Sequence, residues 1–296
     1  MIDRYNKRKG GKMKITDAHC DTLSAWAEGE ASFFKEEETN QDYLQVFALF
    51  GGITKTPRER VEKQIEVYHA RKNILPCRSI LAMEGAHALE GDPQRLIAYH
   101  EKGVRVFGPM WNDDNAFGCG CDTKNDTGLT KKGEELLVLA ERLGMTVDLA
   151  HASEKTFFDA LRILKTPPIV SHACTKKLCN HRRNLSDEQL RALASAGGVL
   201  GICFWDEIVA EHAQIRDVIS QIEYCVSVMG ADFVGFGSDT DGVDNPMEDL
   251  RSPGDIRRLA EDLKTYFSVD IAEKIAGGNF IRLFSQHFEQ EKEDFS

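Results

Sequence analysis

The sequence predicts one α/β domain in which eight parallel strands close into a barrel, the (β/α)8 fold. The chain has 296 residues, of which 42% are hydrophobic, and barrels of this kind form a single unit of about 250 residues. Eight apolar runs of strand length recur along it, and segments with helical periodicity separate most of them. The runs are continuously apolar, which is typical of parallel strands buried on both faces.

The predicted strands are rich in β-branched and aromatic residues, as buried strands usually are. They cover residues 14–18, 43–50, 78–83, 104–110, 145–150, 168–172, 198–205 and 233–239.

Capping residues predict where three of the helices begin. Ser153 precedes an apolar stripe with i, i+4, i+7 spacing, as an N-cap does. Ser186 and Gln189 have the spacing of a capping box. Ser252 and Pro253 match an N-cap followed by proline at the first helical position.

A doubly wound open sheet is the competing architecture. It usually carries a glycine-rich phosphate loop after its first strand, where this chain has DAHCDT. No repeat, low-complexity segment or Pro/Ser-rich linker divides the sequence. We therefore predict one barrel domain at residues 13–290, preceded by a flexible basic arm at 1–12 and followed by a tail at 291–296.

The balance of charge and hydropathy argues against several kinds of partner. Asp and Glu number 48 against 37 Lys and Arg, which gives a net charge of −11. Such a surface repels nucleic-acid phosphates and anionic headgroups. No run reaches the ~20 apolar residues that span a bilayer, and the basic start lacks the apolar segment of a secretory signal. We expect a cytoplasmic protein that binds neither nucleic acid nor membrane.

The eight cysteines are expected to be reduced thiols in a chain of this kind. Cys119 and Cys121 form a single C-x-C pair within GCGCD. A zinc ribbon needs two C-x-x-C knuckles, so a glycine-rich loop is the favoured interpretation of this segment.

Residues suited to catalysis stand at the predicted carboxyl ends of several strands, where the active sites of such barrels lie. Three of the nine histidines fall at these ends. In chain order the candidates are His19, Asp21, Glu84, His151, His172 and Asp239.

Their types and spacing suit a pair of metal ions. His19 and Asp21 are two residues apart, so along a strand both side chains point to the same side and can share one ion. His151 and His172, from neighbouring strands, can share a second ion, and Glu84 has two oxygens with which to bridge both. Zinc favours this mixture of ligands, although manganese, iron and cobalt are also compatible. Two ions ~3.5–4 Å apart would acidify a bridging water.

Each candidate also has a structural explanation. A buried histidine is often a hydrogen-bonded core residue, a strand-end aspartate often caps the next helix, and Glu84 could face solvent. Six independent explanations of this kind are less plausible than one shared site. The remaining histidines are interpreted as structural, namely His69, His87, His100, His181, His212 and His287.

Taken together, the motifs resemble those of the membrane dipeptidase (renal dipeptidase) family, which are dinuclear zinc peptidases of the amidohydrolase superfamily. The resemblance extends over nearly the whole chain and keeps the family's order. The matching segments are DAHCDTL (17–23), AMEGAHAL (82–89), DLAHAS (148–153), SHACTKKLCNHRRNLSD (171–187), GFGSDTDG (235–242) and GGNFIRLF (277–284).

The resemblance implies the same (β/α)8 fold, two zinc ions and a role for each site residue. His19 and Asp21 would bind one ion, and His151 and His172 the other. Glu84 would bridge them.

The resemblance also implies the remaining catalytic roles. Asp239 would act as the acid and base beside a bridging hydroxide and would help to meet the free amine of the substrate. Arg183, the second arginine of R-R-N, would hold the terminal carboxylate, which suits a bidentate guanidinium.

The sequence departs from the family's pattern at two strand ends. Several members carry a histidine after strand four that contacts the substrate carbonyl, whereas this chain has Trp111 followed by Asn112. An indole N–H can donate a hydrogen bond but carries no positive charge, so Asn112 or zinc would have to substitute. After strand seven, Trp205 stands where a tyrosine often lies.

Three hypotheses of function follow. The leading one is a zinc-dependent dipeptidase in which a metal-bridging hydroxide attacks the peptide bond of a small dipeptide; a homodimer is compatible with it. The second keeps the metals but changes the substrate to an N-acyl amino acid or another small amide, because Trp111 and Trp205 could accept an apolar acyl group. The third is a catalytically idle barrel that serves as a binding or scaffold protein.

Overall fold

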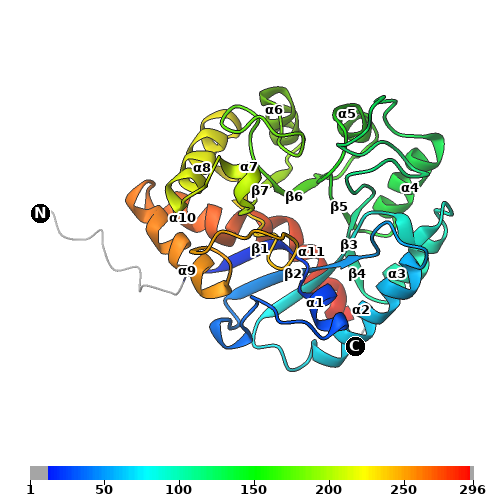
Figure 1. Cartoon of the computed structure of the whole chain (residues 1–296), viewed down its shortest axis with the longest axis horizontal. Helices are drawn as coiled ribbons and strands as arrows, with labels where there is room; N and C mark the ends of the chain where they lie inside the picture. The colour runs from blue at the N-terminus through cyan, green and yellow to red at the C-terminus, as the bar shows by residue number, and fades with distance from the viewer. Residues whose placement is uncertain (1–12, 294–296) are drawn as a thin grey trace, which may run out of the picture.

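The computed structural model of the chain describes residues 13–293 and contains eight parallel strands in one curled sheet (Figure 1). The strands are β1 (Ile15–Cys20), β2 (Tyr43–Phe50), β3 (Arg78–Glu84), β4 (Val104–Gly108), β5 (Thr146–Val147), β6 (Ile169–Ala173), β7 (Val199–Ile202) and β8 (Val234–Phe236).

The strand order confirms the (β/α)8 barrel. Along the sheet the order is β5-β4-β3-β2-β1-β8-β7-β6, so neighbours in sequence are neighbours in space and β1 pairs with β8. Between β5 and β6 the ring closes through a parallel bridge from Asp148 to Ile169 and a 2.8 Å hydrogen bond from the Leu149 N–H to the Ile169 carbonyl. A doubly wound sheet would instead reverse its order at a switch point, so that alternative is wrong.

Helices follow most strands and lie around the sheet in Figure 1. They are α1 (Thr22–Glu28), α2 (Pro57–Arg71), α3 (Arg95–Glu101), α4 (Lys131–Arg142), α5 (Glu154–Ile163), α6 (Asp187–Ser195), α7 (Asp206–Val209), α8 (Ile215–Met229), α9 (Pro253–Asp262), α10 (Val269–Glu273) and α11 (Asn279–Glu293). A π-helical segment, Lys274–Gly278, joins α10 to α11.

The three predicted helix starts are confirmed. The Ser153 side chain accepts a hydrogen bond from a backbone N–H in the first turn of α5. Ser186 and Gln189 form a reciprocal capping box at α6. Ser252 caps α9 in the same way, with Pro253 at its first position.

Strand β5 is much shorter than the predicted run at residues 145–150. The cause is the side chain of Asp148, whose Oδ1 accepts hydrogen bonds from the N–H groups of Ala150 (3.0 Å) and Ser171 (2.9 Å). Beyond the bond from the Leu149 N–H to the Ile169 carbonyl, these side-chain bonds take the place of main-chain bonds that would continue the ladder between β5 and β6. The runs predicted at 198–205 and 233–239 also end early, at Ile202 and Phe236.

The barrel interior has its own core, which is separate from the larger one between strands and helices. Phe280 and Phe284 of α11 stack with ring centroids 5.6 Å apart and pack into it. The strand residues of this inner core are Ala18, Leu44, Val46, Ile80, Ala82, Val106, Ile169 and Val199. Most of them come from the first halves of their strands, so α11 closes the amino-terminal end of the barrel and leaves the carboxyl end for a site.

The chain termini lie partly outside the described residues. The predicted arm at 1–12 falls outside them, as do residues 294–296 of the predicted tail, whereas α11 runs through 291–293. In the part of the chain that is described, no helix has the length and apolar character needed to cross a bilayer.

Candidate metal centre and substrate cavity

All six candidate residues lie at or just beyond the carboxyl ends of strands. His19 and Glu84 lie within the last two residues of β1 and β3, and His172 lies within β6. Asp21 directly follows β1. His151 and Asp239 follow β5 and β8 within a few residues, at the end of D-L-A-H and G-S-D.

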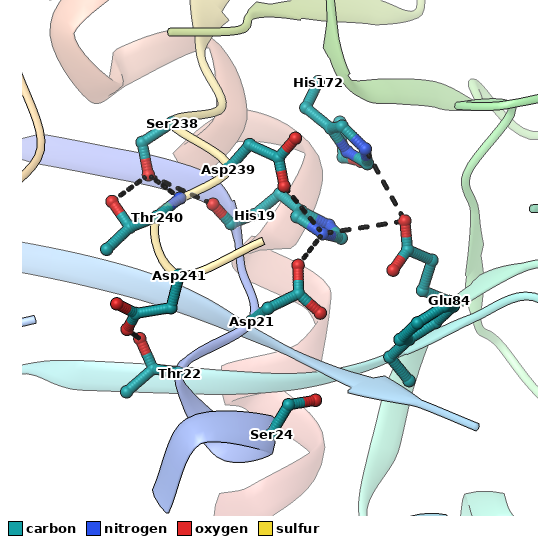
Figure 2. A network of polar contacts seen from close by, with 12 residues as sticks. His19, Asp21, Thr22, Ser24, Glu84, His172, Ser238, Asp239, Thr240 and Asp241 are labelled. Carbon is teal, nitrogen blue, oxygen red and sulfur yellow. Dashed lines mark hydrogen bonds and ion pairs between the residues drawn. The ribbon is translucent and has the colours of Figure 1, made fainter. Parts of the chain in front are cut away.

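Three carboxylates surround the ring of His19 (Figure 2). The His19 Nε2 atom lies 3.2 Å from Asp21 Oδ2 and 3.8 Å from Glu84 Oε1. It lies 3.9 Å from Asp239 Oδ1. Side chains from β1, β3 and the β8 loop therefore meet at one point, although they are far apart in the sequence.

The same oxygen of Glu84 also reaches the other two histidines. Glu84 Oε1 lies 2.8 Å from His151 Nε2 and 3.6 Å from His172 Nε2. The two Nε2 atoms lie 2.9 Å from each other, so both rings present the same edge to the carboxylate. Glu84 thus reaches both His19 and the His151–His172 pair, and the rings of His19 and His172 themselves lie 3.8 Å apart between centroids.

This arrangement fits divalent cations. One set of nearby ligand atoms comes from His19, Asp21 and Asp239, and another from Glu84, His151 and His172. The Asp21 Oδ1 atom is buried and has no hydrogen-bond partner among the described residues. A cation would supply the partner that this oxygen lacks, because carboxylate oxygens and imidazole nitrogens are ligands for zinc and similar metals.

The electrostatics of the site also favour a cation. Burial raises the pKa of the Glu84 carboxyl well above its usual range and raises the pKa of Asp239 to about 6. Burial alone would lower the pKa of His19, but the carboxylates around it, Glu84 foremost, raise it to about 10. Three carboxylates packed together in a buried site need positive charge, which bound divalent ions would supply.

Two of the site residues have unusual backbone conformations. His151 and Asp239 both have φ near +63°, in the left-handed region that residues other than glycine rarely adopt. The Asp239 N–H donates a 3.1 Å hydrogen bond to the His19 carbonyl, and Ser238 donates from Oγ to the buried Asp17 carboxylate (2.6 Å). Such strain persists only where neighbours impose it, and it is concentrated at functional sites.

Hydrogen bonds orient both histidines of the second set. His172 Nδ1 lies 2.8 Å from Ser171 Oγ, and His151 Nδ1 lies 2.7 Å from the Asn112 side-chain oxygen. Both Nε2 atoms are therefore left to face Glu84. Burial lowers the pKa of His151 and of His172, which keeps the rings neutral, as metal ligation requires.

A cavity of about 390 Å³ opens above these residues and is lined by the residues predicted to bind substrate. Arg183 is 5% exposed, and its Nη2 donates a 3.0 Å hydrogen bond to the His172 carbonyl. Trp111 packs beside Phe50, with ring centroids 5.2 Å apart, and Trp205 lines the same cavity. Asn112 also lines it, but its side-chain oxygen is bound to His151.

A second aspartate fastens the β8 loop that carries Asp239. Asp241 Oδ2 accepts hydrogen bonds from Thr22 Oγ1 (2.7 Å) and Ser32 Oγ (2.5 Å), and its Oδ1 accepts from the Phe33 N–H (2.8 Å). Figure 2 shows Thr22 and Asp241 beside the cluster.

Sequence reasoning missed several residues of this site. Asp148 groups with His19 and His172 as a third potential ligand set, and its position in D-L-A-H at a strand end is a signal that could have found it. Ser171 is adjacent to His172 in β6. Because side chains alternate between the two faces of a strand, the sequence predicts that Ser171 points away from the site. Cys121 donates from Sγ to the Asn112 side-chain oxygen (3.2 Å), which no local pattern reveals.

The histidines interpreted as structural lie outside every ligand set found among residues 13–293. The cysteine pair is likewise absent from those sets, since Cys119 Sγ contacts Thr127 Oγ1 (3.3 Å) while Cys121 contacts Asn112. The eight cysteines are free thiols in the structure.

Comparison with known proteins identifies the family of the chain. Residues 11–294 match the sequence profile of the family described as membrane dipeptidase (peptidase family M19). The chain belongs to the membrane dipeptidase family. A Klebsiella pneumoniae relative, described as an uncharacterized protein in the pqqA 5'region, is 32% identical over 233 residues, which are 72% of this chain and 86% of that protein.

Two further proteins that are similar to this chain have more specific descriptions. Dipeptidase aclJ from Aspergillus oryzae is 31% identical over 214 residues, covering 69% of this chain but only 50% of that protein's length. A metallo peptidase from Rhodobacter sphaeroides, solved with a phosphinate mimic of the dipeptide L-Ala-D-Ala, superposes with a TM-score of 0.81 at 19% identity and covers 93% of this chain and 99% of that one. At that identity the structural match shows a shared fold.

Proposed function

We propose that the chain is a metal-dependent dipeptidase with two divalent ions, zinc foremost, in the site built around Glu84. The observation that carries the proposal is the position of Glu84 Oε1, within 3.8 Å of all three histidine Nε2 atoms. One carboxylate that reaches both ligand sets suits a bridge between two ions. Family membership supports the peptidase activity, and the dipeptide mimic in the Rhodobacter sphaeroides relative supports the substrate class.

Divalent ions bound there would polarise the scissile carbonyl and lower the pKa of a water molecule. The chain's own residues supply the rest of the chemistry. Arg183, buried at the cavity wall, holds the terminal carboxylate of the dipeptide through a charge-assisted pair. This contact fixes the substrate in register, so the peptide bond lies over Glu84 and Asp239.

Asp239 moves the proton. Hydrolysis adds the oxygen of water to the carbonyl carbon, breaks the C–N bond and requires a proton on the departing nitrogen. Asp239 lines the cavity and its Oδ1 lies near His19, so this carboxylate can take a proton from water and deliver it to the leaving amine. Its burial and fixed backbone keep it in place for both transfers.

The apolar wall of the cavity supports testing the second hypothesis, a hydrolase of N-acyl amino acids or other small amides. Phe50, Trp111 and Trp205 line it and could accept the acyl group of an N-acyl amino acid. The idle-barrel hypothesis has less support, because the ligand sets are complete although Trp111 stands in place of the strand-four histidine. The cytoplasmic location and the homodimer stay predictions.

Elemental analysis combined with a substrate panel tests the proposal. The purified protein is expected to retain about two divalent ions per chain and to hydrolyse dipeptides faster than matched N-acyl amino acids. Preference for the N-acyl compounds would replace the dipeptidase with the small-amide hydrolase. A protein that neither binds zinc after reconstitution nor hydrolyses any member of the panel would overturn both.

A further inference from the structure

The loop after β4 wraps around His151 and holds both its backbone and its ring. The Cys121 N–H donates a 2.9 Å hydrogen bond to the His151 carbonyl, and Asn112 Oδ1 lies 2.7 Å from His151 Nδ1. The Asp122 N–H donates to the Asn112 carbonyl (2.8 Å), which closes the loop on itself. The Asn112 side chain therefore contacts the histidine ring, while its main-chain carbonyl is held by Asp122 of the same loop.

The group beside His151 Nδ1 decides what the opposite ring nitrogen can do. A neutral imidazole carries its proton on one nitrogen and a free lone pair on the other. His151 Nε2 faces Glu84 and His172, so it can ligate a cation only if the proton sits on Nδ1. An acceptor at Nδ1 favours that tautomer, whereas a donor there would force the proton onto Nε2.

Asn112 could present either an acceptor or a donor, because its amide has both ends. Cys121 selects between them. Its Sγ donates a hydrogen bond to the same Asn112 oxygen (3.2 Å) that faces His151. Because the thiol donates to this atom, the oxygen end of the amide is favoured here over the NH₂ end, and the same oxygen is then the acceptor that faces His151 Nδ1. Gly120, between the two cysteines, has no side chain to collide with the Asn112 carbonyl.

We propose that Asn112 and Cys121 are positioning residues that fix the tautomer and orientation of His151 and so set the affinity of the metal centre. The inference rests on the metal site of the proposed function. It also assigns Asn112 a role other than the substrate contact expected from the sequence, since its acceptor oxygen is already engaged. Metal-binding histidines generally depend on such a partner at the second ring nitrogen.

The experiment measures zinc affinity of the full-length, zinc-loaded protein by equilibrium competition with a chromogenic chelator. Asn112→Leu removes the acceptor at similar size, while Asn112→Asp restores an acceptor oxygen. Cys121→Ala removes the thiol donor, and Cys121→Ser restores a donor. Cys119→Ala is the matched control, because this thiol lies two residues away in the same loop and contacts Thr127 and Asn125 instead.

Asn112→Leu is expected to weaken zinc binding by about 10–100-fold, and Asn112→Asp to keep it near the wild-type value. Cys121→Ala should weaken binding about two- to tenfold, with Cys121→Ser and Cys119→Ala close to wild type. Nitrogen-15 NMR of histidine-labelled protein stripped of zinc should show His151 with its proton on Nδ1, and a shift toward the Nε2 tautomer in Asn112→Leu.

Wild-type zinc affinity in Asn112→Leu would overturn the inference, as would equal losses in Cys119→Ala and Cys121→Ala. If Asn112→Leu does not fold, the comparison of Cys121→Ala with Cys121→Ser decides the question alone. A wild-type protein that binds no zinc would refute the proposed function instead, so the two failures are distinguishable.

Discussion

Replacing Asp239 with asparagine separates its chemical role from its structural one. The change keeps the size of the side chain, and asparagine accepts the left-handed backbone that this position requires (φ +63°). The hydrogen bond from the residue 239 N–H to the His19 carbonyl does not involve the side chain and should persist. We therefore expect Asp239→Asn to fold and to retain its metal.

The magnitude follows from what the carboxylate contacts. Its Oδ2 lies 3.8 Å from Cys203 Sγ and its Oδ1 lies 3.9 Å from His19 Nε2, and the residue lines the cavity, so the carboxylate is placed to exchange protons with the substrate. An amide cannot carry that proton. Loss of a general acid–base group costs about 10²–10⁴-fold in kcat, or about 3–5 kcal/mol of barrier. Arg183 still binds the carboxylate, so KM should rise by no more than about tenfold, which corresponds to the lost contact between Asp239 and the substrate amine.

The assay follows amino-acid release from a neutral dipeptide, with the metal content of each preparation measured by mass spectrometry. Asp241→Asn is the matched control, since it also has a left-handed backbone but directs its carboxylate to Thr22, Ser32 and Phe33. That variant should lose thermal stability and change kcat less than Asp239→Asn does. A kcat for Asp239→Asn within about fivefold of wild type, at full metal content, would refute the assignment of proton transfer.

Three further changes test other parts of the molecule. Arg183→Met should raise KM for dipeptides about 10–100-fold, because a charge-assisted pair with the substrate carboxylate is lost. His287→Gln should make the free energy of unfolding less sensitive to acid. Burial lowers the pKa of His287 from 6.5 to about 4, so in wild type the unfolded chain takes up the proton before the folded chain does. The free energy of unfolding of the wild type therefore decreases as the pH falls from 6.5 toward 4. Between pH 7 and 5 the variant should lose about 2 kcal/mol less than wild type in urea unfolding. Phe284→Ala should destabilise the fold by about 3–5 kcal/mol, because this ring is fully buried in the inner core.

Each of these changes has its own control. Dipeptides with an amidated carboxyl end should be cleaved equally poorly by wild type and Arg183→Met, and a uniform loss on every substrate would contradict the carboxylate contact. An unchanged pH dependence in His287→Gln would show that the buried ring bonded to Thr146 (2.9 Å) does not titrate as inferred. A loss below about 1 kcal/mol in Phe284→Ala would mean that α11 does not close the barrel.

The fold could be predicted because its signals are local and repeated. Continuous apolar runs indicate buried parallel strands, and Ser153, Ser186 and Ser252 cap helices whichever tertiary contacts follow. The ends of strands were harder to predict. Asp148 takes over hydrogen bonds that main-chain groups would otherwise make, and Asp17 does the same for the Ser238 N–H (2.7 Å). Nothing in an apolar pattern shows where a side chain will replace a main-chain partner.

The site could be predicted where the barrel topology alone places a residue. His19, Glu84 and His172 stand at strand ends, and the rule that parallel strands end at one rim brings them together. The role of Asn112 could not be predicted in this way. It depends on a loop that returns to the rim through the bonds of Cys121 and Asp122, and loop conformations follow from many weak contacts rather than from periodicity.

The cost of building the site explains why it needs the rest of the barrel. His151 and Asp239 hold left-handed backbones at about 1–3 kcal/mol each, and three carboxylates are buried around His19. The inner core beneath them and α11 at the closed end hold the strands that carry these residues in register. Ions that bind only the folded chain would offset part of the cost, because a ligand selective for the native state raises its stability. Metal affinity and fold stability are therefore linked in this protein, and a change that loosens one should be detectable in the other.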